Sequence, residues 1–108
     1  MPNNLNSIFK SIADPTRREI FHLLVLASSA LSITQISSHF EISRQGITKH
    51  IRMLQNAGLI DMTQKGREQF CIANVQPLKA IHDWVKFYEG FWDDKLKNLG
   101  DYLDQKNL

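Results

Sequence analysis

The sequence contains a single cysteine, Cys71. One cysteine cannot form a disulfide within the chain, and it cannot by itself supply the thiolate ligands of a structural metal site. Cys71 lies in a segment with the alternation of a half-buried strand, where a free cysteine is expected to pack as a small apolar residue. We therefore do not expect it to act as a redox switch.

Long apolar runs and a secretory signal are also missing. No apolar stretch approaches the length that is needed to cross a membrane, and the first seven residues lack the basic start and apolar run of a signal peptide. We therefore expect a cytoplasmic protein. With 108 residues, of which 43% are hydrophobic, the chain is long enough to bury a core as one small domain over residues 1–108.

A catalytic constellation is not recognisable either. His22, His39, His50 and His82 are scattered over separate predicted elements. No nucleophile, base and orienting group occur at a spacing that indicates a shared site. The sequence therefore predicts a protein that is not an enzyme and that carries no cofactor.

Net charge is only +2, but its distribution is uneven. Residues 1–42 carry three basic and three acidic side chains, residues 43–74 carry five and two, and residues 75–108 carry five and six. The middle segment therefore has a net charge of +3, and no carboxylate occurs between Ser43 and Leu59. This asymmetry predicts a small electropositive footprint for a polyanion.

That footprint coincides with a predicted amphipathic helix over about residues 43–57. Ser43 is a good N-cap residue, and Gly58 suits the position that follows a helix. At about 100° per residue, one side is apolar and carries Ile47, Ile51, Leu54 and Ala57, whereas the opposite side carries Gln45, Lys49, Arg52 and Asn56. The outer face supplies the donors that base edges and phosphates accept, which predicts a DNA-recognition helix.

A second helix precedes it at close range. Ser32 and Gln35 form the pattern of a capping box, which opens a helix that is expected to run to about Phe40. Glu41 and Ile42 leave only a tight connection before Ser43, so the spacing is that of a helix-turn-helix. The alternative is a pair of core helices in an all-α bundle, and it is disfavoured because the segment that follows Gly58 is not helical.

Residues 59–73 have the alternation of a β-hairpin around a turn at Gln64–Arg67. The apolar side chains that are expected to pack on the preceding helices are Ile60, Met62, Phe70 and Ile72. Lys65 and Arg67 at the tip could then reach DNA phosphates or a minor groove. A solvated turn without a partner is the alternative.

The last predicted helix covers about residues 76–105, although Gly90 and Gly100 could interrupt it. Its apolar residues recur at steps of three and four, and they cover more surface than one small domain can bury. We expect a symmetric dimer, with an interface formed by Leu78, Ile81, Trp84, Val85, Tyr88, Trp92 and Leu99. The alternative is a ligand pocket lined by Trp84, Tyr88, Phe91 and Trp92.

Several blocks of the chain together resemble the ArsR family of winged helix-turn-helix repressors. The blocks are residues 12–18 (Ile-Ala-Asp-Pro-Thr-Arg-Arg), residues 42–51 (Ile-Ser-Arg-Gln-Gly-Ile-Thr-Lys-His-Ile), Leu54, residues 57–60 (Ala-Gly-Leu-Ile) and residues 66–68 (Gly-Arg-Glu). The resemblance implies a mainly α fold with a small β-hairpin, the wing, and a homodimer joined by the first and last helices. It also implies repression at an operator with two-fold symmetry, and the ending resembles the autorepressor branch, which makes the protein's own promoter a candidate.

By the same resemblance, Arg44, Gln45, Thr48 and Lys49 would enter the major groove, with Lys65 and Arg67 on the wing. Helical geometry agrees for Gln45 and Lys49, places Thr48 on the flank, and adds Arg52 as a candidate for phosphate contact. His50 falls near the packed edge of the helix. We therefore expect it to pack or to position the backbone rather than to read a base.

Metal-sensing members of the family carry a Cys-x-Cys motif before the recognition helix, or paired His and carboxylate ligands on the last helix. This chain has residues 34–38 (Thr-Gln-Ile-Ser-Ser) at the first place, and its last helix lacks a repeated histidine spacing. We expect no metal site. A metal- or small-molecule-responsive sensor, and a winged-helix module for protein contacts without DNA binding, are the alternative functions.

Overall fold

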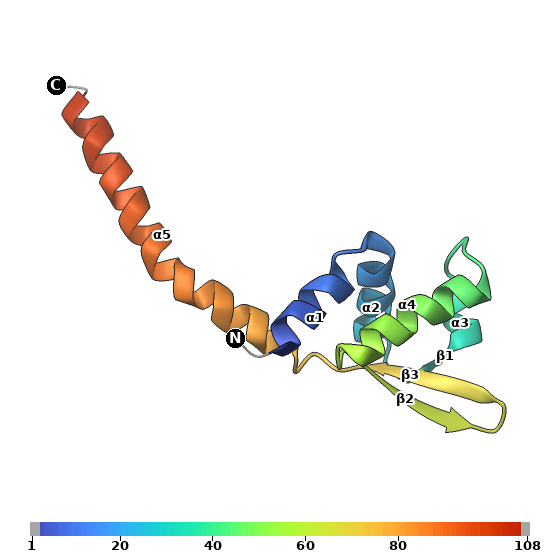
Figure 1. Cartoon of the computed structure of the whole chain (residues 1–108). Helices are drawn as coiled ribbons and strands as arrows, with labels where there is room; N and C mark the ends of the chain where they lie inside the picture. Colours follow the sequence, from blue (N-terminus) through green and yellow to red (C-terminus); the bar gives the residue numbers. More distant parts are fainter. Residues whose placement is uncertain (1–2, 107–108) are drawn as a thin grey trace. The chain divides into compact units, whose positions relative to one another are not determined.

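The computed structural model describes residues 3–106, with side chains from residue 5 to residue 105. The chain divides into two compact units, residues 1–78 and residues 79–108, and each is described by itself. Figure 1 shows the elements in chain order: α1 (Asn3–Ile12), α2 (Pro15–Leu26), β1 (Leu31–Ser32), α3 (Ile33–Ser37), α4 (Arg44–Asn56), β2 (Ile60–Lys65), β3 (Glu68–Ala73) and α5 (Leu78–Lys106). The expectation of a single domain over residues 1–108 stays a prediction.

Side-chain caps define where the helices of the first unit begin. The Ser32 side chain accepts a hydrogen bond from the Gln35 amide at 3.1 Å, and the Gln35 side chain accepts one from the Ser32 amide at 2.8 Å. The predicted capping box of α3 is therefore confirmed. The Ser43 hydroxyl accepts from the Gly46 amide at 3.1 Å and caps α4, which begins and ends within one residue of the predicted bounds.

Helix α3 is shorter than predicted, since it ends at Ser37 and not at Phe40. The Ser38 hydroxyl donates to the Gln35 carbonyl at 2.7 Å and so occupies one of the last carbonyls of the helix. The chain then turns through residues 38–43 into α4. Because both helices stay short and closely linked, the first unit retains the geometry of a helix-turn-helix.

The sheet contains a strand that the sequence pattern did not reveal. Strand β1 is only two residues long and pairs antiparallel with β3, with Leu31 opposite Cys71 and Ser32 opposite Phe70. The strand order is β1-β3-β2, so the expected two-stranded hairpin is part of a three-stranded sheet. A two-residue strand has no detectable alternation, and only its neighbour β3 defines it.

The register of the hairpin corrects one prediction. Ile60 pairs with Ala73 and Met62 pairs with Cys71, so these four residues share one face of the sheet. Ile60 and Cys71 are fully buried, whereas Ile72 is 54% exposed. The prediction that Ile72 packs inward was wrong. Phe70 lies on the same face as Ile72 but is half-buried. The two-residue turn Gly66–Arg67 places the odd-numbered residues of β3, such as Cys71, on the face toward the core.

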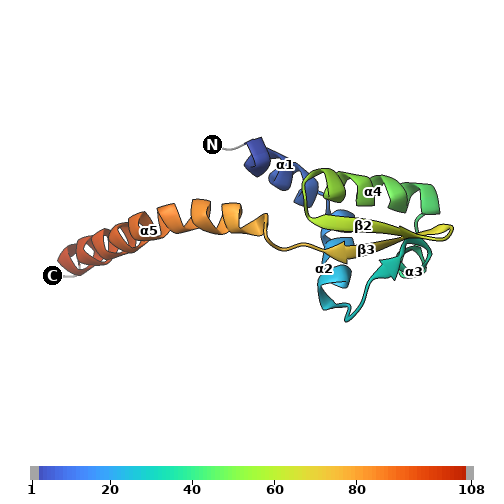
Figure 2. The same ribbon diagram turned by 90° about the horizontal axis from the view of Figure 1, so that it is seen from below.

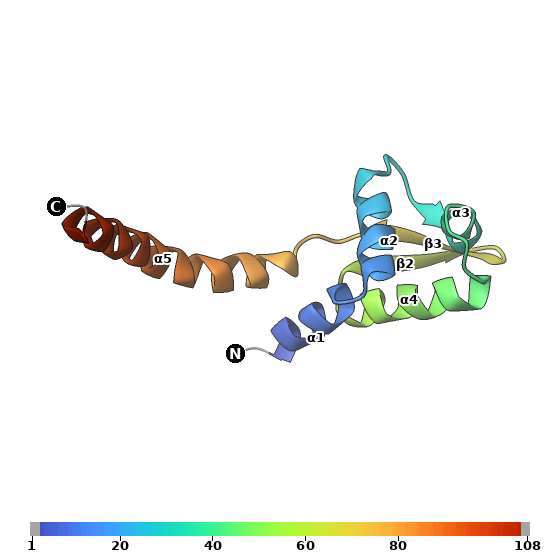
Figure 3. The ribbon, with the colours of Figure 1, turned by 90° about the horizontal axis from the view of Figure 1, so that it is seen from above.

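The core of the first unit lies where α1, α2, α4 and the base of the hairpin meet. Its most buried side chains are Ile8, Ile20, Ile36, Ile47, Ile51, Leu54, Leu59, Ile60 and Cys71. Figures 2 and 3, which view the chain from below and from above, both show α4 alongside the β2–β3 hairpin. The core therefore holds the predicted recognition helix and the wing together.

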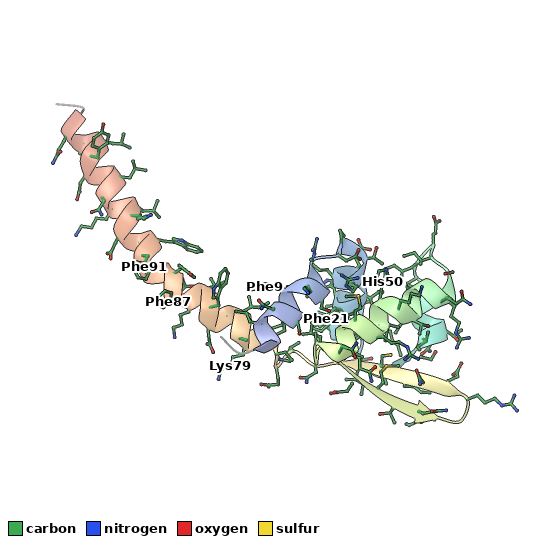
Figure 4. The ribbon with its side chains drawn as sticks, in the orientation of Figure 1. Phe9, Phe21, His50, Lys79, Phe87 and Phe91 are labelled. Atoms are coloured by element: carbon green, nitrogen blue, oxygen red, sulfur yellow. The ribbon has the colours of Figure 1, made fainter. Side chains whose placement is uncertain are left out.

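Helix α5 has 29 residues and runs without interruption through Gly90 and Gly100. It begins at Leu78, two residues later than predicted. Its exposed apolar residues are Trp84, Phe87, Tyr88, Phe91, Trp92, Leu96, Leu99, Tyr102 and Leu103. Phe87 and Phe91, labelled in Figure 4, have ring centroids 5.4 Å apart. Within residues 3–106, no helix combines the length and the apolar character that a membrane span requires.

Candidate nucleic-acid interface

Helix α4 separates its apolar and polar residues as the periodicity predicts. Ile47, Ile51 and Leu54 have no exposed surface, and burying each of them contributes about 1.5–3 kcal/mol relative to leaving it in water. Gln45, Lys49 and Arg52 on the opposite face are exposed, and so is Arg44 at the start of the helix; all four were predicted to contact DNA. The packed face therefore fixes the helix so that its donors point away from the core.

Thr48 lies at the flank of this polar face and is half-buried. Its hydroxyl donates to the Arg44 carbonyl one turn earlier at 2.9 Å. The hydroxyl proton is therefore already used within the helix, and the lone pairs and the methyl group are what Thr48 can offer to a ligand. Geometry makes Thr48 a lesser candidate for base contact than Gln45 or Lys49.

The beginning of α4 favours a negatively charged ligand. No acidic side chain lies in its first turn, whereas Arg44 is the first residue of the helix. The unpaired amides of a helix N-terminus carry a partial positive charge, which adds to that of the guanidinium. The Ser43 cap is uncharged, so it satisfies one amide without cancelling this field.

The orientation of α4 is also fixed from the side of α1 and α2. Arg17 of α2 donates from Nε to the Ser11 carbonyl at 2.6 Å and from Nη2 to the Lys10 carbonyl at 3.1 Å, near the end of α1. Its Nη1 lies 3.4 Å from Nδ1 of His50 on α4, a residue labelled in Figure 4. The buried Ser11 hydroxyl donates to the Met53 carbonyl of α4 at 3.4 Å. These contacts confirm that His50 packs against its neighbours.

Sequence reasoning missed the role of Arg17. A capping residue is visible in sequence because it lies within four residues of its partner, but Arg17 and His50 are 33 residues apart. Arg18 has a related local role, since its Nη1 donates to the Ile12 carbonyl at 2.6 Å. Both arginines of the 12–18 block therefore stabilise the end of α1, where carbonyls have no helical partner.

The wing carries its two cations at the turn. Lys65 ends β2, and Arg67 lies in the turn before β3, and both side chains are exposed. Gly66 has φ +63°, which places a residue of positive φ at the first central position, as a type II′ hairpin turn requires. The turn thus places the side chains of Lys65 and Arg67 at the tip of the hairpin, away from the core.

Cys71 is a packing residue, as predicted. It has no exposed surface, and burial raises the pKa of its thiol to about 11. The reactive thiolate is therefore scarce at neutral pH. Within the described residues, no group of three or more His, Cys, Asp or Glu side chains gathers where it could hold a metal ion.

A short helix, a tight turn, a capped helix with a cationic outer face and an adjacent hairpin with two cations at its tip define a winged helix-turn-helix of the DNA-binding class. Comparison with known proteins agrees with this class. Residues 12–63 match the model of a helix-turn-helix domain family. The transcriptional repressor SdpR of Bacillus subtilis (strain 168) is 33% identical over 81 residues, which cover 75% of this chain and 88% of that protein.

Solved structures give the same result. The crystal structure of the ArsR family transcriptional regulator RHA00566 has a TM-score of 0.78 and 28% identity, over 86% of this chain and 94% of that one. A homodimeric winged helix-turn-helix domain of Mb0332 from Mycobacterium bovis shares the fold, with a TM-score of 0.63 and 17% identity over 81% and 82% of the two chains. The chain belongs to the ArsR family of winged helix-turn-helix DNA-binding transcriptional regulators.

Proposed function

We propose that this regulator acts as a homodimeric repressor that occupies an operator of two-fold symmetry, with its own promoter as the first candidate. The observation that carries the proposal is the outer face of α4, which presents exposed Gln45, Lys49 and Arg52 and lacks any carboxylate. Gln45 and Lys49 supply donors for base edges, while Arg52, Lys65 and Arg67 neutralise phosphates. Arg44 and Thr48 complete the predicted contact set.

Dimerisation follows from the exposed apolar surface of α5. Trp84, Val85, Tyr88 and Trp92 line an apolar recess of about 340 Å³ on this helix. Such a surface is stabilised when a second copy covers it, with its side chains filling the recess. The predicted interface is therefore Leu78, Ile81, Trp84, Val85, Tyr88, Trp92 and Leu99. The homodimeric state of the Mycobacterium bovis domain supports this proposal.

Two recognition helices in such a dimer would enter successive major grooves about 34 Å apart, and the two-fold symmetry of the dimer would require a palindromic site. An occupied operator then excludes RNA polymerase, which is how binding becomes repression. SdpR is named as a transcriptional repressor, which supports repression over activation. The protein would act in the cytoplasm as a binding protein without enzyme activity.

The test is fluorescence anisotropy with labelled duplexes that tile the DNA upstream of the protein's own reading frame, against a scrambled duplex of equal length and composition. We expect tight binding to one upstream duplex, with an affinity that falls steeply with salt. Equal weak binding to both duplexes would place the operator elsewhere and contradict autorepression. An absence of binding even at low salt would overturn the DNA-binding proposal in favour of a protein-contact module.

A further inference from the structure

A polar cleft of about 350 Å³ lies between the recognition helix and the wing, and we call it the helix–wing cleft. Its lining comes from three elements: Arg52 and Gln55 of α4, Met62 and Gln64 of β2, and Gln69 of β3. Among these residues, only Arg52 was predicted from the sequence to contact DNA. The cleft therefore brings one guanidinium and three carboxamides to the same place.

The register of the hairpin explains why this cleft is polar. Met62 pairs with Cys71 and Gln64 pairs with Gln69, so all four side chains lie on the sheet face that turns toward α4. Cys71, nearer the base, is buried, whereas Gln64, nearer the tip, is exposed. The hairpin thus changes from an apolar to an amide-lined surface as it leaves the core beside α4.

The same register removes negative charge from the cleft. The carboxylates of the hairpin, Asp61 and Glu68, pair with Ile72 and Lys65 and lie on the opposite face of the sheet. Helix α4 carries no carboxylate from Arg44 to Asn56. Arg52 therefore faces neutral amides in the cleft, and an anion that enters meets donors from both walls without a competing carboxylate.

The shape of duplex DNA points to what would fill such a cleft. A sugar-phosphate strand separates each major groove from the adjacent minor groove. If α4 lies in a major groove and the tip of the wing reaches the neighbouring minor groove, that strand must pass between them. We propose that the helix–wing cleft clasps one backbone phosphate of the operator, with Arg52 as the charged donor and the amides of Gln64 and Gln69 as neutral donors. This inference rests on the proposed DNA-binding function.

The donors suit one phosphate group. A guanidinium presents paired N–H groups to two phosphate oxygens, which gives the bidentate geometry that phosphate recognition favours. The Gln64 amide donates to the Gly66 carbonyl at 3.4 Å, and this bond leaves its second N–H available. Such a contact carries no base information, so it fixes the depth and angle of α4 in the groove.

The test compares Arg52→Gln with Lys10→Gln, which removes the same charge from an exposed site on α1. Affinity for the best upstream duplex is measured by anisotropy across a salt series. Each phosphate contact contributes roughly 0.9 to the steepness of log affinity against log salt, and a dimer has one cleft in each of its two protomers. Arg52→Gln should therefore make this slope shallower by about 1.8. Lys10→Gln should leave the slope unchanged, and Arg52→Lys should retain most of it with weaker binding.

A second measurement locates the contact. Single phosphates of the duplex are replaced one at a time by neutral methylphosphonate. One replacement at the strand between the grooves should weaken the wild type about tenfold and should have a much smaller effect on Arg52→Gln, which keeps only the neutral amide donors. Gln64→Leu and Gln69→Leu should show partial loss at the same phosphate.

The outcomes separate the two proposals. If the wild type binds no duplex, the DNA-binding function itself fails. If the wild type binds but the salt slopes of Arg52→Gln and Lys10→Gln agree, or every methylphosphonate weakens both proteins equally, the phosphate clasp is wrong and the DNA-binding function stands. Because Arg52 is exposed, urea unfolding should confirm that Arg52→Gln folds as the wild type does.

Discussion

Arg17 on α2 points its Nη1 at Nδ1 of His50 on the recognition helix, with 3.4 Å between the two nitrogens. A guanidinium has only donors, so Nδ1 of His50 is the acceptor in this contact. The same guanidinium holds the Lys10 and Ser11 carbonyls at the end of α1. One side chain therefore links three helices.

Replacing Arg17 with alanine should destabilise the first unit. The change leaves two carbonyls and a half-buried imidazole without their donor, so we expect a loss of about 2–3 kcal/mol in the free energy of unfolding by urea. His50→Gln removes only one of the three contacts and should cost less than about 1 kcal/mol. Equal losses in the two variants would show that the contacts with α1 do not contribute.

The Asp14 cap at the start of α2 should make the stability of the first unit sensitive to acid. The hydrogen bond from the Arg17 amide to the carboxylate of Asp14, 3.0 Å long, holds the pKa of Asp14 below its ordinary value. Because the folded pKa is lowered, the stabilisation is present at neutral pH and is lost as pH falls below about 4, through the folded pKa.

Asp14→Ala should therefore lower the urea midpoint at pH 7, and its difference from the wild type should shrink at acidic pH. Asp14→Asn keeps an acceptor for the Arg17 amide and should lie between the two proteins. A difference that is the same at pH 7 and pH 3 would contradict a role for the ionised carboxylate.

Cys71 should resist alkylation in the native protein. Burial raises the pKa of its thiol to about 11, so iodoacetamide at pH 8 should react on the order of 100-fold more slowly than with the urea-unfolded chain. The unfolded chain loses this proton first, so the free energy of unfolding should fall as pH rises from about 9 to 11. Similar alkylation rates in both states would show that β3 opens readily.

Gln45→Ala should reduce specificity more than general affinity. The side chain is exposed on the outer face of α4, and the loss of a paired contact with a base should cost about 1–3 kcal/mol on the preferred site. Anisotropy with the operator and with single-base variants measures this loss. If Gln45→Ala weakens binding to scrambled DNA by the same amount, Gln45 contacts the backbone and does not read a base.

Trp92→Glu should dissociate the dimer. The tryptophan is 55% exposed on α5 and would be buried twice in a symmetric interface, so a carboxylate there should raise the dimer dissociation constant about 100-fold or more. Sedimentation equilibrium measures this change. Lys97→Gln, which alters the charge equally on the polar side of α5, is the control, and an unchanged dimer in both variants would contradict the α5 interface.

Much of the fold could be predicted from residues that are close in sequence. The Ser32 and Ser43 caps were visible because a cap and its partner are three residues apart. The separation of Ile47 and Ile51 from Gln45 was visible because helical periodicity repeats within a few residues. The contacts of Arg44, Gln45, Thr48, Lys49, Arg52, Lys65 and Arg67 with DNA, and the dimer interface on α5, stay predictions.

The phase of β3, the short strand β1 and the helix–wing cleft could not be predicted in the same way. Phe70 and Cys71 are adjacent, and alternation alone allows either to face the core. The pairing of Cys71 with both Met62 and Leu31 decides that Cys71 is the residue that faces the core. Likewise, Gln55 and Gln69 read as ordinary surface residues until the hairpin is placed beside α4.

The sequence by itself therefore determined the capped helices, the cationic face of the recognition helix and the apolar stripe of α5, because each depends on spacings within one element. The tertiary structure alone decided the register of the sheet, the link from Arg17 to His50 and the polar lining beside Arg52. These depend on contacts between residues far apart in the chain, and their geometry is fixed only when the helices and the hairpin pack around a shared core.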